Sequence, residues 1–305
     1  GRPGGAGDDP RTRPARLTTP PLPVRDGLGP ARVRLRGGAV LVEFAERFGE
    51  AAAAKVLRGE VFCADGTPVT ADTVLPPGSV VYLYRELPEE VPVPFDIPIL
   101  YRDENIVVVD KPHFLATTPR GRHVAQTALV RLRRQLDLPE LSPAHRLDRL
   151  TAGVLLFTTR REVRGRYQRL FADEAVRKIY LAGAPVRPDL EFPRVVRSRI
   201  IKRRGSLQAV EEPGEPNAET LVELLDASAG RYRLTPRTGR THQLRVHMAA
   251  LGVPIVNDPL YPDVVDVAPD DFSSPLQLLA HSVEFTDPLT GRTHRFVSAR
   301  SIGGQ

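Results

Sequence analysis

Cysteine, tryptophan and long apolar runs are scarce or absent in this sequence. The 305 residues include one cysteine, Cys63, and no tryptophan. A single cysteine forms neither an internal disulfide nor a cysteine-based zinc site, which favours a reducing, cytoplasmic location. No apolar run approaches the roughly 20 residues that a membrane-spanning helix needs, and the Arg- and Pro-bearing N-terminus lacks the apolar stretch of a signal peptide. We therefore expect a soluble cytoplasmic protein with no membrane segment.

The common catalytic motifs are also missing. The sequence contains no G-x-x-x-x-G-K-[ST], G-x-G-x-x-G, H-E-x-x-H or G-x-S-x-G pattern, which excludes the usual phosphate loops, dinucleotide turns, zinc proteases and serine hydrolases. His242 and His247 are five residues apart on a predicted helix, so they lie about 140° apart around it and do not share a metal-binding face. We expect no metal and no cofactor.

Positive charge is plentiful but concentrated near the N-terminus. The net charge is +6, and residues 1–40 hold eight Arg against three Asp, which accounts for +5 of it. A basic protein suggests a nucleic-acid partner, yet the rest of the chain is almost neutral. Any RNA-binding surface must therefore come from local patches of basic residues.

Four segments differ in composition. Residues 1–29 are rich in Gly, Pro and Arg without apolar periodicity, which predicts a disordered tail. Residues 30–86 have helical spacing and then short β-branched stretches separated by turns, a small α+β module that resembles the RNA-binding module first known from a small-subunit ribosomal protein; a generic α+β appendage is the alternative. Three prolines in residues 87–96 predict a linker. Residues 97–303 form the large domain.

The large domain is predicted to be α+β, with a mixed, mainly antiparallel sheet and flanking helices, because its strands and helices do not alternate regularly. Strands are expected at 97–101, 105–110, 153–158, 178–181, 218–225, 231–236, 278–285 and 294–298, and helices at 123–137, 161–172 and 240–251.

Three polar segments of this domain, residues 145–149, 178–180 and 237–247, are too dense in charge to be ordinary surface. Each alone has a structural explanation. Asp148 stands between two arginines and could form an ion pair, Tyr180 could be a half-buried strand aromatic, and Arg245 could be a solvated helix residue.

Together the segments closely resemble the RluA-type RNA pseudouridine synthases. The matching positions are His145-Arg146-Leu147-Asp148, Thr151 and Gly153, then Lys178 and Tyr180, then residues 239–247, and finally Gly252, Pro254, Ile255 and Asp258-Pro259-Leu260-Tyr261. Residues 105–112 match the opening strand of that family, so the likeness extends from about 97 to 300. The sequence departs from the family where glycine is usual, at Phe114 and Asn257, and at Leu150, Ala152 and Val253.

The resemblance implies an isomerase that converts uridine to pseudouridine in structured RNA, with Asp148 as its carboxylate. The reaction detaches N1 of the base from the sugar and reattaches the base through C5; an ionised carboxylate can start it as a nucleophile or by removing a sugar proton. Arg245 is implied to keep Asp148 ionised and aimed. Tyr180 is implied to stack on the base and to help remove the proton at C5. The further residues expected to bind RNA are Arg146, which would hold open the space of a flipped base, and His145, Arg149, Lys178, Arg240, His242 and Gln243.

We expect a monomer that acts on RNA, ribosomal (rRNA) before transfer (tRNA), without a metal. Two alternatives stay open from the residues alone. One is a catalytically silent RNA-binding or RNA-folding protein on the same scaffold, which the intact Asp148, Tyr180 and Arg245 disfavour. The other is a nucleoside hydrolase, which is disfavoured because glycosidases generally pair two carboxylates and one is evident here.

Overall fold

The computed structural model describes residues 20–303. The chain forms two compact units, Gly1–Glu86 and Leu87–Gln305. Within residues 20–303, none of the helices has both the length and the apolar content that crossing a bilayer requires.

The first unit contains two short helices and two small sheets. Its elements are β1 (Ala31–Arg34), β2 (Gly38–Ala39), α1 (Val40–Phe48), α2 (Glu50–Leu57), β3 (Phe62–Cys63), β4 (Val74–Leu75) and β5 (Val80–Leu83). The strand order is β1-β5-β3 in one sheet, and β2 pairs with β4 in the other. Val40, Phe44 and Val56 from the helices meet Val81 from β5 in the core. The α+β composition matches the expectation, although β1, which precedes the helices, was not predicted.

The predicted N-terminal tail extends over residues 1–29, of which 1–19 lie outside the described residues. The part that is described packs against the first unit. The Tyr84 hydroxyl donates a hydrogen bond of 2.7 Å to the carbonyl oxygen of Pro23. The guanidinium of Arg25 lies 4.9 Å from the centre of the Tyr84 ring. The described part of the predicted tail therefore makes specific contacts with Tyr84.

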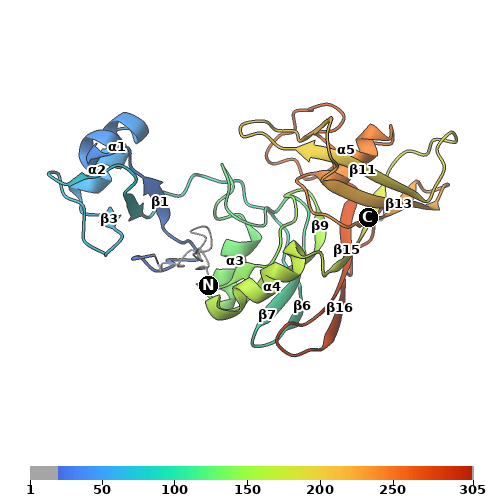
Figure 1. Ribbon diagram of the computed structural model, residues 1–305, viewed down its shortest axis with the longest axis horizontal. Coiled ribbons are helices and arrows are strands. Elements are labelled where there is room, and N and C mark those ends of the chain that lie inside the picture. Colours follow the sequence, from blue (N-terminus) through green and yellow to red (C-terminus); the bar gives the residue numbers. More distant parts are fainter. Residues whose placement is uncertain (1–19, 304–305) are drawn as a thin grey trace, which may run out of the picture. The chain divides into compact units, whose positions relative to one another are not determined.

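The second unit contains one large sheet (Figure 1). Its elements are β6 (Ile99–Arg102), β7 (Ile106–Lys111), α3 (Ala128–Leu136), β8 (Ser142–Pro143), β9 (Ala152–Thr158), the 3-10 helix η1 (Arg161–Val163), α4 (Arg164–Ala172), β10 (Arg177–Gly183), β11 (Arg194–Ile201), β12 (Val210–Glu212), β13 (Ala218–Asp226), β14 (Arg231–Pro236), α5 (Gln243–Ala250), β15 (Leu278–Thr286) and β16 (Thr293–Val297). The order is β12-β11-β13-β14-β10-β15-β9-β7-β6, with β16 on β15 and β8 on β9. Only the β15–β9 pairing is parallel among these, so the predicted mixed, mainly antiparallel sheet is confirmed.

Alternation along the central strands places the helices on opposite faces of the sheet. Val107 and Val109 of β7 pack in the cluster that contains Leu132 of α3 and Leu244 of α5. Their neighbours Ile106 and Val108 pack in the other cluster, with Tyr167 of α4. Successive strand residues point to opposite faces, so α3 and α5 cover one face and α4 covers the other. Strands buried on both faces explain the uninterrupted apolar run of β7.

The segment predicted as a linker, residues 87–96, is packed onto the second unit. Val93 lies in its main core. The carboxylate of Glu90 accepts hydrogen bonds from the backbone N–H groups of Val124, Ala125 and Gln126. Helix α3 begins at Ala128 and not at 123 as predicted, because Thr127 is extended and its hydroxyl caps the helix by accepting the N–H of Val130.

Candidate active site

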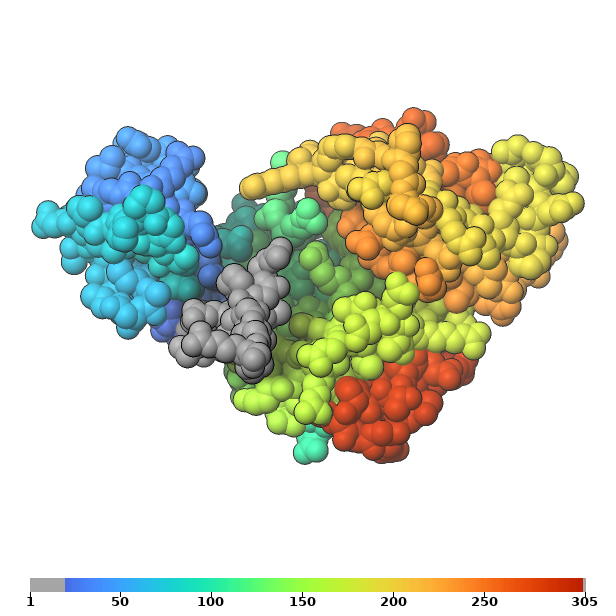
Figure 2. Space-filling model, in the orientation of Figure 1, coloured from blue at the N-terminus to red at the C-terminus, as the bar shows by residue number. Residues whose placement is uncertain are grey.

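A cleft of about 760 Å³ opens in the second unit. Figure 2 shows the surface hollowed between α4, in lime green, and the gold residues that follow β11. The residues that line the cleft come mainly from β8 and the loop after it, the second half of α4, β10, the loop after β14, the start of α5 and the start of β15. The predicted residues that line it are His145, Arg146, Asp148, Lys178, Tyr180, Arg240, His242, Gln243 and Arg245. Arg149 is not among them.

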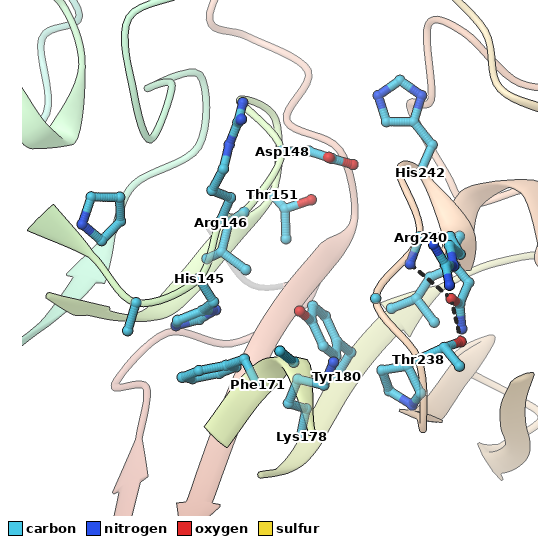
Figure 3. Close-up of a pocket in the computed structure, with 18 of the residues that line it drawn as sticks. His145, Arg146, Asp148, Thr151, Phe171, Lys178, Tyr180, Thr238, Arg240 and His242 are labelled. Carbon is cyan, nitrogen blue, oxygen red and sulfur yellow. Dashed lines mark hydrogen bonds between the residues drawn. The ribbon is translucent and has the colours of Figure 1, made fainter. Parts of the chain in front are cut away.

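Asp148 projects from the loop between β8 and β9, and its two neighbours in the chain are fixed from outside. The Thr117 hydroxyl donates to the carbonyl of Leu147 and accepts from the N–H of the same residue. The Lys111 ammonium, which is fully buried, donates to the carbonyl of Arg149 at 3.1 Å and to two other backbone carbonyls. Asp148 itself is 29% exposed. Its backbone is therefore held while its carboxylate faces the cleft (Figure 3).

Arg245 joins Asp148 to a second carboxylate, Asp258. One guanidinium nitrogen of Arg245 lies 3.4 Å from Asp148 Oδ2. Two others form a bidentate pair with Asp258 at 2.8 and 2.7 Å, and both of these side chains are almost wholly buried. Burial opposes the charged form of Arg245, but the hydrogen bonds and charge of Asp258 outweigh it, and the pKa of Arg245 is raised. The bidentate pair fixes the guanidinium plane. The remaining nitrogen, Nη1, therefore points at Asp148.

Tyr180 and Lys178 come from β10 and form the floor of the cleft. In Figure 3 the Tyr180 ring lies below Asp148 and Thr151. Burial, assisted by the charge of Asp148, raises the pKa of Tyr180, so its phenol stays neutral. Burial lowers the pKa of Lys178, and Glu174 opposes that shift. The β10–β15 pairing shifts register between Ile179 and Tyr180, an irregularity of the kind that redirects side chains near active sites.

Two predicted RNA-binding residues have internal partners instead. The His145 ring stacks on Phe171 at 4.2 Å, and its Nε2 accepts the N–H of Leu156. Burial lowers the pKa of His145 to about 3, so the ring is neutral. Gln243 is buried, and its amide joins Thr238 to Thr220. Both residues shape the walls of the cleft, whereas Arg146 and Arg240 are exposed in it.

Four residues to which the sequence gave no role hydrogen-bond to predicted site residues or to their neighbours in the chain. They are Asp258, Tyr261, Lys111 and Thr117. Asp258 and Tyr261 do belong to the fourth matching stretch of the sequence, and their fixed spacing from Arg245 was the signal that could have suggested a contact. Lys111 directly follows the predicted strand at 105–110 and ends the observed strand β7. Nothing in the sequence singles out Thr117.

One group of side chains in residues 20–303 has a geometry that could hold a metal ion, namely Asp103, Asp287 and His294. It does not line the cleft. Asp287 already accepts hydrogen bonds from the Tyr167 hydroxyl and from His294, and Asp103 accepts one from Tyr101. These hydrogen bonds explain why the three side chains lie together without a metal ion.

Comparisons with known proteins agree with this geometry. The model of the RNA pseudouridylate synthase family matches residues 105–250. The dual-specificity RNA pseudouridine synthase RluA of Salmonella typhi is 35% identical over 208 residues, which cover 65% of this chain and 90% of that protein. Human pseudouridylate synthase RPUSD2 is 37% identical over 175 residues, 55% of this chain but only 31% of the human protein. The chain thus spans nine tenths of one relative and about a third of the other.

Solved structures show the same fold. Human RNA pseudouridylate synthase domain containing 1 superposes with a TM-score of 0.53 at 24% identity, covering 67% of this chain and 84% of that one. Human RNA pseudouridylate synthase domain containing 4 gives 0.51 at 25% identity, with 67% and 88% covered. The predicted fold and family are therefore confirmed, and the chain belongs to the RluA-type RNA pseudouridine synthases, which are isomerases.

Proposed function

We propose that Asp148 is the catalytic carboxylate with which this chain isomerises uridine in structured RNA. The observation that carries the proposal is the contact between Asp148 and the buried Arg245, at the wall of a cleft large enough for a nucleotide. A partly exposed carboxylate beside a fixed cation keeps its direction, which both routes into the reaction require. Tyr180 supports the proposal because it offers a ring face below Asp148.

The role of Tyr180 follows from its protonation state. A phenol whose pKa is raised by burial is a poor general base, so we assign it chiefly to stacking on the uracil. Arg146 is exposed on the opposite side of the cleft from His242 (Figure 3). A paired uridine cannot reach Asp148 without leaving its stack, and an exposed arginine at this position can fill the vacated space.

Tritium release provides the direct test. RNA that carries tritium at uracil C5 loses the label when the base is reattached through that carbon. We expect release with the wild type and none with Asp148→Asn, which keeps the shape of the side chain. Equal release from both, or none from either with a cognate RNA, would contradict the assignment, and the second result would favour the alternative of a catalytically silent RNA-binding protein.

For the target and the setting, we propose ribosomal RNA before transfer RNA, and a cytoplasmic monomer that needs no metal ion. The support for a ribosomal target is the α+β module at residues 30–86, whose sequence resembles a module of a small-subunit ribosomal protein. Mapping pseudouridine in both classes of RNA, with and without the gene, tests the target. Sedimentation of the purified chain tests the monomer, and activity in the presence of a chelator tests the independence from metal.

A further inference from the structure

His242 lies at the cleft in a constrained position. It precedes α5 with a backbone φ of 56°, in the left-handed region that residues other than glycine seldom adopt, although asparagine, aspartate and histidine do so more often than the rest. Its Nδ1 is 2.7 Å from the hydroxyl oxygen of Tyr261. Its Nε2 has no hydrogen-bond partner within residues 20–303, and the side chain lines the cleft. In Figure 3 it stands on the wall opposite Arg146.

Tyr261 determines where the imidazole proton lies. The Tyr261 hydroxyl is buried, and its oxygen accepts the backbone N–H of Ala209 at 2.7 Å. Burial raises the pKa of Tyr261 to about 12, so the phenol keeps its proton. Among the described residues, His242 Nδ1 is the one acceptor within reach of that proton. Burial also lowers the pKa of His242, against the pull of Asp148, so the ring is neutral. A neutral imidazole that accepts at Nδ1 carries its proton on Nε2.

We propose that His242 is a neutral hydrogen-bond donor, through Nε2–H, to a uracil carbonyl oxygen or a phosphate oxygen of the nucleotide bound at Asp148, and that Tyr261 is the positioning residue that sets this tautomer. The donor role rests on the proposed function of the cleft. Detaching N1 from the sugar leaves negative charge on the uracil, which its carbonyl oxygens share. A fixed neutral donor stabilises such charge without giving up its proton.

Ala209 connects this arrangement to the β11–β12 hairpin. Residue 209 lies in the segment between those strands, and the neighbouring Gln208 side chain donates to the backbone carbonyls of Leu260 and Pro262. The hairpin is therefore hydrogen-bonded to the same stretch that carries Tyr261. Asp258, two residues before Leu260, holds Arg245. One short segment, residues 258–261, thus orients both Arg245 and His242.

The tautomer is tested first, by long-range proton–nitrogen NMR on histidine-labelled protein without RNA. We expect the His242 ring, identified as the one whose signals disappear in His242→Gln, to carry its proton on Nε2 at neutral pH. In Tyr261→Phe we expect the Nδ1-protonated form to appear. A wild-type ring protonated on Nδ1, or on both nitrogens, overturns the proposal, and this readout does not depend on whether the chain is catalytic.

The donor role is tested with a pair of substitutions. Glutamine places an N–H where Nε2 lies, whereas asparagine tolerates the left-handed backbone but reaches only as far as Nδ1. We expect His242→Asn to lower kcat by about 10²-fold, the effect of removing one fixed donor, and His242→Gln to lose much less. Tyr232→Phe is the matched control for Tyr261→Phe, because the buried Tyr232 hydroxyl donates to the carbonyl of Pro185, outside the cleft. Equal losses in both His242 variants overturn the donor role.

Modified substrates identify the acceptor oxygen. Sulfur accepts hydrogen bonds more weakly than oxygen, so replacing the true acceptor removes the difference between wild type and His242→Asn. RNA with 2-thiouridine or 4-thiouridine at the target tests the base carbonyls, and a phosphorothioate beside the target tests the backbone. A difference that persists at full size with every one of these substrates overturns the proposal.

Discussion

Arg245 contacts two carboxylates, and substituting each with asparagine is expected to separate stability from activity. Asp258 is 1% exposed and binds the guanidinium through two short hydrogen bonds. Asp148 is 29% exposed and approaches a single nitrogen at 3.4 Å. Asp258→Asn leaves a buried guanidinium without its main counter-charge, whereas Asp148→Asn removes a long, partly solvated contact. The first change should therefore destabilise the fold and the second should not.

The magnitudes differ enough to measure. Breaking a buried ion pair on one side costs about 3–5 kcal/mol, and Asp258 also accepts the N–H groups of Leu260 and Tyr261. A partly exposed pair contributes about 0–1 kcal/mol. In a unit of roughly 220 residues, each kcal/mol lowers Tm by about 2–4 °C. Asp258→Asn is thus expected to lower Tm by about 6–20 °C, and Asp148→Asn by less than about 4 °C.

Thermal unfolding followed by circular dichroism measures the first effect, and tritium release at a temperature where both variants are folded measures the second. We expect Asp148→Asn to release no label. Asp258→Asn should retain reduced release, lower by about 10²-fold, because a misaligned Arg245 no longer holds the carboxylate in place. Equal Tm losses in the two variants, or an unchanged Tm in Asp258→Asn, would refute the reasoning that Asp258 supports mainly stability and Asp148 mainly activity.

Three further outcomes are expected. Tyr180→Ala should weaken RNA binding by about 1–3 kcal/mol, the value of one stacked base, whereas Tyr180→Phe should bind as the wild type does in a filter assay; equal weakening would exclude stacking. Gly153 has a φ of 122°, and a Cβ there would lie 2.2 Å from the Ala280 carbonyl oxygen, so Gly153→Ala should cost about 2–5 kcal/mol in urea unfolding. Gly165→Ala, on open helix surface, should gain up to about 1 kcal/mol. Because burial lowers the pKa of His145 to about 3 from its ordinary 6.5, the unfolded chain binds more protons between those values. The stability that His145 contributes is then complete above pH 6.5 and falls as the pH decreases, by up to about 1.4 kcal/mol per pH unit; wild type and His145→Gln should therefore diverge on acidification, and parallel pH curves would contradict it.

Apolar periodicity predicted most of the large sheet but not its edge. β14 has the predicted bounds, and β13 and β15 differ by one residue. β11 was missed because arginines are interspersed among its apolar residues: Arg197 is exposed, whereas Ile200 is buried. A strand with one solvated face carries charges that look like a basic patch. The start of α3 could not be read locally either, because the extended Thr127 at its N-cap is held by pairing with Ala116, eleven residues earlier.

Two departures from the family pattern have a backbone explanation. Phe114 and Asn257 occupy positions where the family usually has glycine, and both have positive φ, 69° and 65°. The local backbone is thus the one that glycine favours, although the side chains differ. Phe114 is held there by aromatic contacts with Phe95 and Phe272, and the Asn257 amide donates to the Pro275 carbonyl. A substitution that looks severe in the sequence therefore leaves the chain path intact.

The motif residues were predicted together because their segments resemble one family, but this resemblance could not rank the contacts among them. It suggested Arg245 for Asp148 and gave Asp258 no role, although Asp258 is the tighter partner by geometry and burial. Separation along the chain does not reveal such a ranking, because contact and burial are set by the sheet. Physical chemistry explains why the looser partner is the one proposed to react. Asp258 is almost wholly buried, does not line the cleft and is bound by a bidentate arginine and two amide groups, so a substrate cannot reach it. Asp148, held through its neighbours in the loop, faces the cleft.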